Sequence, residues 1–356
     1  MRLTGIAAGI LVLAASTYPL ARPIASRASA AGSGAFQESS PRGPLIDPSR
    51  PSQESQTPQQ QEPPQSSAPL QVQTTVVNVF TTVRDRHNGI VSDLTKNDFK
   101  VFEDGVEQKI SYFTKEVDLP LSLALLMDTS ISMQQILGAE KDAASRFVQE
   151  VMHKKDEAIV MSFDTDVNLL ADFSEDPPVL ERAIRRAEIN VDAAGIGGTG
   201  GTVPSRGGGT NLYDAVYLAA HDELTSEAGR KAIILLTDAE DTGSKLSEND
   251  AIESAQRADA VLHFVLITDP SATEGYGPGV ASKMAHETGG RVISVRNDRG
   301  LEKAFDTIAE ELRSQYVIGY YPANTKRDGT FRKIRVDVDR ADLKILARKG
   351  YYAPSR

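Results

Sequence analysis

Five oxygen-bearing side chains stand where apolar runs of the sequence give way to helical patterns. An Asp-x-Ser-x-Ser motif at residues 128–132 follows one apolar run, a Thr follows three glycines, and an Asp follows a second apolar run. Because the carboxyl ends of parallel strands meet at one edge of a sheet, we expect these side chains to lie together there. They are Asp128, Ser130, Ser132, Thr210 and Asp238.

These five oxygens would suit a divalent metal ion. Hard cations such as Mg²⁺ prefer oxygen ligands in small, near-octahedral sites that keep exchangeable positions. Only Asp128 and Asp238 bring charge, so we expect a carboxylate from a partner to complete the coordination. We expect Mg²⁺ or Mn²⁺, with Ca²⁺ as an alternative. In a purely structural interpretation, the hydroxyls cap helices and Asp238 ends its strand.

The five residues resemble, one by one, the metal-ion-dependent adhesion site of von Willebrand factor A domains. The resemblance covers roughly residues 119–313. It implies that an acidic residue of a partner protein occupies the open coordination position, with Asp128 and Asp238 acting partly through water. The flanking segments at residues 316–322 and 348–352 resemble those of a bacterial group of such domains that is common in Acidobacteria.

Within residues 119–313, apolar runs alternate with helical patterns. Continuous apolar runs are typical of parallel strands that are buried on both faces, whereas a period of 3.6 residues is typical of helices. The alternation predicts an α/β domain with a doubly wound, mostly parallel sheet. The expected strands are 121–127, 158–163, 232–237 and 261–268, and the expected helices are 133–152, 212–224, 248–258, 280–288 and 301–312.

The flanks of this domain, residues 71–118 and 314–356, carry patterns of short strands. Neither flank is long enough to form a core alone, so we expect the two to pair into a small β-sandwich. The expected strands are 76–83, 99–102 and 110–113, which would form a meander, and 315–321, 331–338 and 343–352.

The N-terminal residues predict export. Arg2 precedes an apolar run at residues 5–15 that is too short to anchor stably in a bilayer, so residues 1–30 are expected to be a removable signal peptide. Residues 31–70 are rich in Pro, Gln and Ser and are expected to be a disordered linker. The protein would then be periplasmic, displayed at the cell surface or secreted. The alternative is an uncleaved membrane anchor, the one case in which we expect membrane contact.

Composition narrows the classes of function. The net charge of −10 argues against a nucleic-acid-binding protein, which needs a concentrated basic face. The absence of Cys excludes disulfides and thiolate metal sites. The His residues form no metal-ligand pair, and there is no Gly-x-Ser-x-Gly motif for a Ser nucleophile. The glycine-rich segment 195–209 lacks the ending of a P-loop, so we expect a loop beside the metal edge.

Four other aspartates near these strand ends have structural explanations. Asp214 is expected on a helix face and Asp241 in an exposed turn, with support of the metal ligands as the alternative. Asp164 and Asp166 are expected in a hairpin turn.

The sequence therefore predicts a non-catalytic, metal-dependent module that binds a protein partner through an exposed Asp or Glu. One alternative is a structural envelope protein with a vacant metal site. The other is a metal-assisted hydrolase, which needs a general base near the metal; the sequence offers no convincing one.

Overall fold

The structure, a computed structural model, describes residues 76–115, 119–190, 209–268 and 277–355. The predicted signal peptide, the predicted linker and most of the glycine-rich loop lie outside these residues. None of the helices in the described part is long and apolar enough to cross a membrane.

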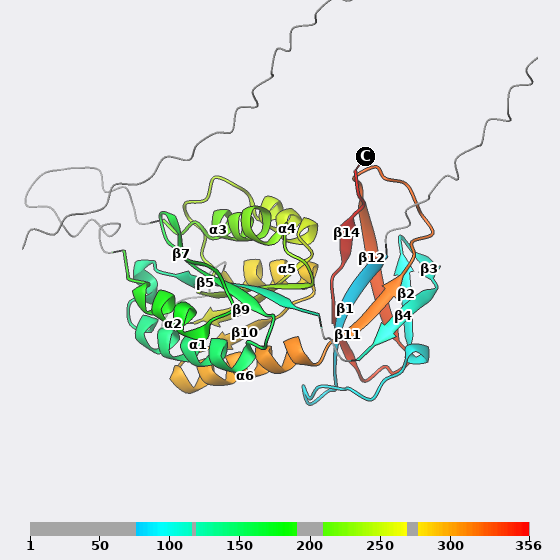
Figure 1. Cartoon of the computed structure of the whole chain (residues 1–356), viewed down its shortest axis with the longest axis horizontal. Coiled ribbons are helices and arrows are strands. Elements are labelled where there is room, and N and C mark those ends of the chain that lie inside the picture. Colours follow the sequence, from blue (N-terminus) through cyan, green and yellow to red (C-terminus); the bar gives the residue numbers. More distant parts are fainter. Residues whose placement is uncertain (1–75, 116–118, 191–208, 269–276, 356) are drawn as a thin grey trace, which may run out of the picture. The chain divides into compact units, whose positions relative to one another are not determined.

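A sheet of six strands runs through the middle of the described chain, in the order β10-β9-β8-β5-β6-β7 (Figure 1). All neighbours pair in parallel except β7, which is antiparallel to β6 at one edge. The strands are β5 (Leu121–Asp128), β6 (Glu157–Phe163), β7 (Val167–Ser174), β8 (Arg230–Thr237), β9 (Ala260–Ile267) and β10 (Val292–Val295).

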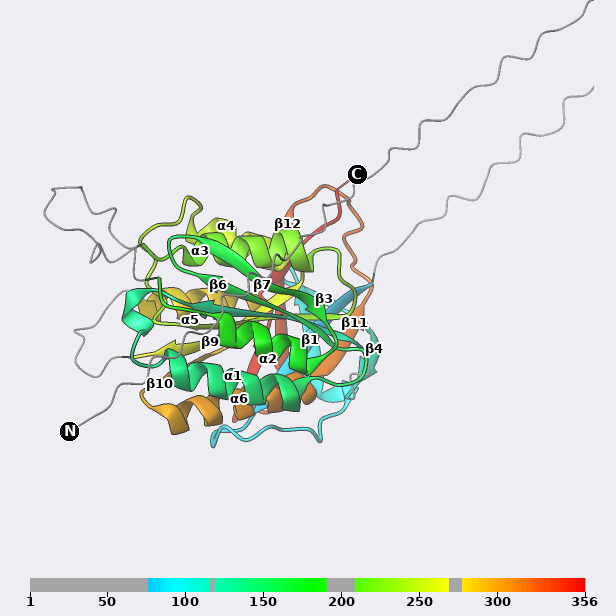
Figure 2. The ribbon, with the colours of Figure 1, turned by 60° about the vertical axis from the view of Figure 1, so that its left-hand side comes forward.

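Helices cover both faces of this sheet (Figures 1 and 2). Helices α1, α2 and α6 pack on one face, and α3, α4 and α5 pack on the other. They are α1 (Leu137–Val151), α2 (Pro177–Arg186), α3 (Leu212–Leu218), α4 (Glu248–Arg257), α5 (Gly277–Thr288) and α6 (Asp298–Arg313). The π-helical turn Ala219–Leu224 extends α3. The predicted doubly wound α/β fold is confirmed.

Strand β5 shows why the central sheet holds its register. Every residue of β5 is buried. Leu123 and Leu125 pack into the core under α1, whereas Ala124 and Leu126 pack into the core under α3. A shift of one residue would exchange these two sets, and each buried large apolar side chain stabilises the fold by about 1.5–3 kcal/mol. The end of β5, which carries Asp128, is therefore fixed.

Two four-stranded sheets form a β-sandwich, in the orders β13-β1-β11-β4 and β14-β12-β2-β3. Each sheet combines strands from both flanks, as predicted. The N-terminal strands are β1 (Val77–Arg84), β2 (Phe99–Glu103), β3 (Val106–Gln108) and β4 (Ile110–Thr114). The C-terminal strands are β11 (Tyr316–Tyr320), β12 (Phe331–Val338), β13 (Lys344–Ala347) and β14 (Gly350–Tyr352).

The predicted pairing inside the N-terminal flank is wrong. Strands β1 and β4 both pair with β11, and β2 pairs with β12 and β3, so no meander forms. The stretch expected as one strand at 343–352 is two strands, one in each sheet. The apolar alternation defines which residues face the core, but it does not define the neighbour with which a strand pairs.

A buried ion cluster joins the sandwich to α6. Arg84, at the end of β1, donates from Nε to Glu311 Oε1 at 2.7 Å, and Arg291 Nη1 lies 3.2 Å from the same oxygen. The His263 ring, on β9, has its Nδ1 3.8 Å from Glu311 Oε2, which is too far for a hydrogen bond.

Candidate metal site

The candidate residues lie at the carboxyl edge of the central sheet. Asp128 is the last residue of β5, and Asp238 comes directly after β8, the neighbouring parallel strand. Ser130 and Ser132 follow β5 in the short 3-10 turn that leads toward α1. Four of the five predicted residues therefore belong to two adjacent strand ends.

The Asp-x-Ser-x-Ser segment is joined by its own hydrogen bonds. Asp128 Oδ1 accepts from the backbone N–H of Ser130 at 2.9 Å. The hydroxyl oxygens of Ser130 and Ser132 lie 3.0 Å apart. Asp128 is completely buried, whereas Ser132 is exposed. The segment thus presents one buried carboxylate and two adjacent hydroxyls, the outer of which faces solvent.

Asp238 is held by the residues on either side of it. Thr237 Oγ1 donates to Asp128 Oδ2 at 2.6 Å and accepts from the backbone N–H of Ala239 at 2.9 Å. Ala239 has a φ of 60°, in the left-handed region that non-glycine residues rarely adopt. The first residue of α5, Gly277, packs so close that a Cβ there would lie 2.2 Å from the Asp238 carbonyl oxygen. Backbone contacts therefore define this turn.

Burial and the negative charge of Asp238 together raise the pKa of Asp128 to about 7, against hydrogen bonds from Ser130 and Thr237 that lower it. Burial raises the pKa because a buried carboxylate loses the water that stabilises its charge. In the described part of the chain, neither aspartate has a Lys or Arg partner. A bound cation would supply the missing positive charge.

Asp164 does more than the predicted hairpin turn. The turn itself is present, since the Asp164 N–H donates to the Asp166 carbonyl at 3.0 Å. In addition, its buried carboxylate accepts from Thr129 Oγ1 at 2.6 Å and from Asn190 Nδ2 at 2.8 Å. Its carbonyl accepts from the Asn211 N–H at 2.8 Å. Asp164 therefore connects the segment after β5 to the start of α3, a role that the local sequence did not reveal.

Thr210 lies on the loop that leads into α3. It is nearly buried, and no hydrogen bond joins its hydroxyl to the other four candidate residues. Its backbone is fixed to the loop after Asp238: the Thr210 N–H donates to Thr242 Oγ1 at 3.0 Å, and its carbonyl accepts from the N–H of Thr242 at 3.1 Å. The structure thus attaches Thr210 to the Asp238 loop through backbone bonds.

Asp214 and Asp241 fix the same loop. Asp214 accepts from the backbone N–H groups of Lys245 and Leu246, the latter at 2.9 Å. Asp241 accepts from Ser244 Oγ at 2.5 Å and from the Tyr213 N–H at 3.2 Å. Both carboxylates therefore position the loop between Asp238 and α4 against the start of α3, and neither is a free surface charge.

Glu140 is a third carboxylate whose charge acts on this edge, and no sequence pattern marks it. It lies in the first turn of α1 and is completely buried. Burial raises its pKa well above the usual range, and the charges of Asp128 and Asp238 raise it further. Among the residues that the structure describes, neither oxygen of its carboxylate has a hydrogen-bond partner.

This arrangement of strand ends can be compared with known families. Residues 123–240 match the model of the von Willebrand factor type A domain. The match covers about a third of the chain and includes all five candidate residues. The von Willebrand factor A domain inferred from the sequence is therefore confirmed for this segment. The metal site itself and the bacterial subgroup stay predictions. No curated protein matches the chain in sequence.

Several solved structures resemble the chain at low sequence identity. The conserved hypothetical protein BatB from Bacteroides thetaiotaomicron is 17% identical, with a TM-score of 0.41, over 55% of this chain and 100% of that one. A von Willebrand factor type A protein from Catenulispora acidiphila is 14% identical, with a TM-score of 0.45, over 73% and 75%. Proximal thread matrix protein 1 from the mussel byssus, with a zinc-occupied MIDAS motif, is 14% identical, with a TM-score of 0.43, over 56% and 49%. These similarities are too low to transfer a function.

The donor set of the von Willebrand factor A segment fits a divalent cation. No group of three or more Asp, Glu or His side chains in the described residues is placed to hold a metal by itself. The candidate set instead combines two carboxylates with hydroxyls, which suits a cation that retains water ligands. In the described residues no Lys or Arg pairs with Asp128 or Glu140, and burial disfavours the charged form of both carboxylates unless a cation binds near them.

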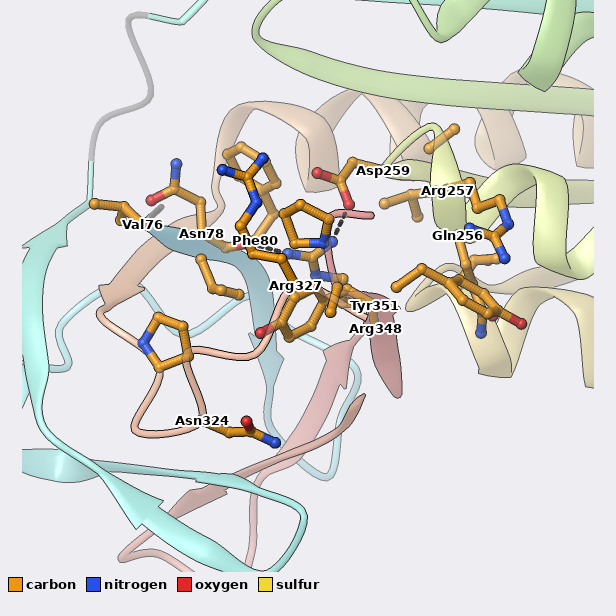
Figure 3. A pocket seen from close by; sticks show the side chains of 18 of the residues that line it. Val76, Asn78, Phe80, Gln256, Arg257, Asp259, Asn324, Arg327, Arg348 and Tyr351 are labelled. Carbon is orange, nitrogen blue, oxygen red and sulfur yellow. Dashed lines mark hydrogen bonds and ion pairs between the residues drawn. The ribbon is translucent and has the colours of Figure 1, made fainter. Parts of the chain in front are cut away.

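A cavity of about 700 Å³ lies elsewhere in the chain, between the start of β1, the end of α4 and the last described residues (Figure 3). None of the five candidate residues lines it. Two of the arginines that line the cavity lie over tyrosine rings, and both are already paired with acidic side chains. Arg348 bonds to Asp259, and Arg257 lies 2.7 Å from Glu253 and 3.8 Å from the centre of the Tyr352 ring. These two arginines are therefore already engaged, and the cavity contains none of the predicted site residues.

Proposed function

We propose that this protein is a non-catalytic, metal-dependent protein-binding module that acts outside the cytoplasm. One observation carries the proposal. Asp128, Ser130 and Ser132 are connected by hydrogen bonds, Asp238 acts on Asp128 electrostatically, and no basic side chain balances the two aspartates in the described residues. The family match over the same residues supports it.

Asp128, Ser130, Ser132, Thr210 and Asp238 would hold the cation, with Asp128 and Asp238 acting partly through water. Mg²⁺ or Mn²⁺ suits this set best, because five oxygen ligands, only two of them charged, fit a small, hard cation that keeps exchangeable water positions. Ca²⁺ is the alternative. The bound cation would act as an electrophilic anchor for an Asp or Glu side chain of a partner protein.

A catalytic role has less support. A metal-assisted hydrolase needs an acid or base that can exchange a proton with a substrate bound at the metal. Glu140 is the carboxylate that could be considered as this acid or base, but it is completely buried and cannot meet a substrate from solvent. A structural protein with a vacant site would differ from the proposed module only in failing to bind metal. The proposed export rests on the N-terminal sequence pattern. Export and protein binding are consistent with each other, because the module would meet its partner outside the cytoplasm.

Water-proton relaxation with Mn²⁺ tests the open coordination position. Mn²⁺ bound to the protein should enhance the relaxation of water protons, because exchangeable waters remain on the ion. Added acetate, a mimic of the partner's carboxylate, should reduce this enhancement by replacing a water. An enhancement that acetate leaves unchanged, under conditions where Mn²⁺ stays bound, would contradict recognition through a carboxylate.

A further inference from the structure

Glu140 occupies a position that a carboxylate rarely keeps without compensation. Its side chain has 0% exposure, and both carboxylate oxygens lack a hydrogen-bond partner among the described residues. A buried charge is strongly unfavourable unless it is paired or hydrogen-bonded. Nothing in the described part of the chain supplies such a partner. A cation bound near Glu140 would compensate for this unfavourable burial and would explain why the protein keeps a carboxylate here.

A second buried glutamate shows how this chain normally treats such a group. Glu311 is also at 0% exposure, yet it receives Arg84 at 2.7 Å and Arg291 at 3.2 Å. Glu103, which is 3% exposed, likewise accepts hydrogen bonds from the hydroxyls of Tyr320 and Tyr351, so both of these buried carboxylates have partners. Around Glu140, the charges that act are those of Asp128 and Asp238, both negative. The missing positive charge is the one that the proposed metal would bring.

We propose that Glu140 is a positioning residue of the metal site, which accepts a hydrogen bond from water bound to the cation that Asp128, Ser130 and Ser132 hold. This inference rests on the proposed function. Glu140 acts through water, because the described carboxylates and imidazoles do not form a group that could ligate a metal directly. Mg²⁺ retains several waters in protein sites, and these waters donate hydrogen bonds to nearby carboxylates.

This role has two consequences of opposite sign. Without metal, Glu140 is a buried and unpartnered carboxylate, so it destabilises the fold. With metal, it orients a bound water and adds a third negative charge near the cation, so it strengthens binding. A residue with a merely structural role would not both lower the stability of the metal-free protein and strengthen metal binding.

The test is to titrate Mg²⁺ calorimetrically into the full chain and to record its thermal unfolding with and without the ion. The variant is Glu140→Gln, which keeps the shape of the side chain. The matched control is Asp142→Asn, the same change on the same helix, at a side chain that is 63% exposed. We expect Glu140→Gln to bind Mg²⁺ about 10–100-fold more weakly than wild type. Without metal, its Tm should be higher than that of wild type. Asp142→Asn should leave the affinity for Mg²⁺ unchanged and should not raise the Tm, because it only weakens an exposed pair with Arg185.

The outcomes separate the inference from the function on which it rests. If wild type binds Mg²⁺ and Glu140→Gln binds it with the same affinity, the role of Glu140 is refuted while the metal site stands. If Glu140→Gln lowers the Tm of the metal-free protein, the residue is structural and the inference again fails. If folded wild type does not bind Mg²⁺ at all, the proposed function fails first.

Discussion

Thr237 Oγ1 donates a 2.6 Å hydrogen bond to Asp128 Oδ2, and this bond joins the ends of two adjacent strands. Thr237 is the last residue of β8, and Asp128 is the last residue of β5. Because Asp238 follows Thr237 directly, the bond connects the backbone that carries Asp238 to the carboxylate of Asp128. The geometry of this edge therefore depends on one buried hydroxyl.

Replacing Thr237 with Val should destabilise the protein by about 1–3 kcal/mol, because Asp128 loses a buried donor and the Ala239 N–H loses its acceptor. Val has nearly the shape of Thr, so packing should change little. Urea denaturation of wild type and variant measures the difference. Thr237→Ser is the matched control, since it keeps the hydroxyl. If Val and Ser cost the same free energy of unfolding, the bond to Asp128 is not the cause.

The central sheet could be predicted from the sequence because its strands are buried on both faces. β5, β6, β8 and β9 are covered by helices on each side, so each is a run of apolar residues. β7 was not predicted. It lies at the edge of the sheet and carries Asn168 and Asp172 among its apolar residues, so the run is broken. α2 and the short β10 were missed as well.

The local part of the candidate site could also be predicted, whereas its long-range supports could not. Asp128, Ser130 and Ser132 lie within five consecutive residues, and a strand end places them together. Asp164 and Glu140 matter through contacts that form only when the segments after β6 and β5 fold back onto the edge. A glutamate in the first turn of a helix is usually a solvent-exposed residue that the helix dipole favours, so Glu140 gave no signal in the sequence.

The Arg84–Glu311 pair should contribute far more to stability than a surface pair. Replacing Arg84 with Met leaves Glu311 buried with only Arg291, and the loss of one partner from a buried pair costs about 3–5 kcal/mol. Chemical denaturation measures the change in the free energy of unfolding.

The control for this prediction is Arg185→Met. Arg185 pairs with Asp142 at 3.1 Å, but both side chains are more than half exposed, so the change should cost no more than about 1 kcal/mol. If Arg84→Met costs as little as Arg185→Met, the buried cluster does not join β1 to α6 energetically.

His263 should make the stability of the protein depend on pH. Burial, together with the charge of Arg291, lowers the pKa of His263 to about 3, against an ordinary value of 6.5. Between these two pH values the unfolded chain binds a proton that the folded chain does not. Stability should therefore fall as the pH falls through this window, by at most about 1.4 kcal/mol per pH unit from this group.

The variant His263→Phe removes this contribution, so its free energy of unfolding should depend less on pH between 3 and 6.5 than that of wild type. The matched control is His286→Phe, which makes the same change at an exposed ring. Equal slopes for wild type and His263→Phe would show that the buried ring does not titrate as described.

The most direct test of the metal site is the calorimetric titration of Mg²⁺ and Mn²⁺ into the folded protein. The variant is Ser130→Ala/Ser132→Ala, which removes two candidate ligands whose hydroxyls lie 3.0 Å apart near the surface. The control is Ser226→Ala, which removes an exposed hydroxyl that contacts only Glu227. We predict saturable binding to wild type and to Ser226→Ala, and its loss in the double variant. Folded wild type that binds neither ion, or a double variant that binds as well as wild type, would contradict the metal site.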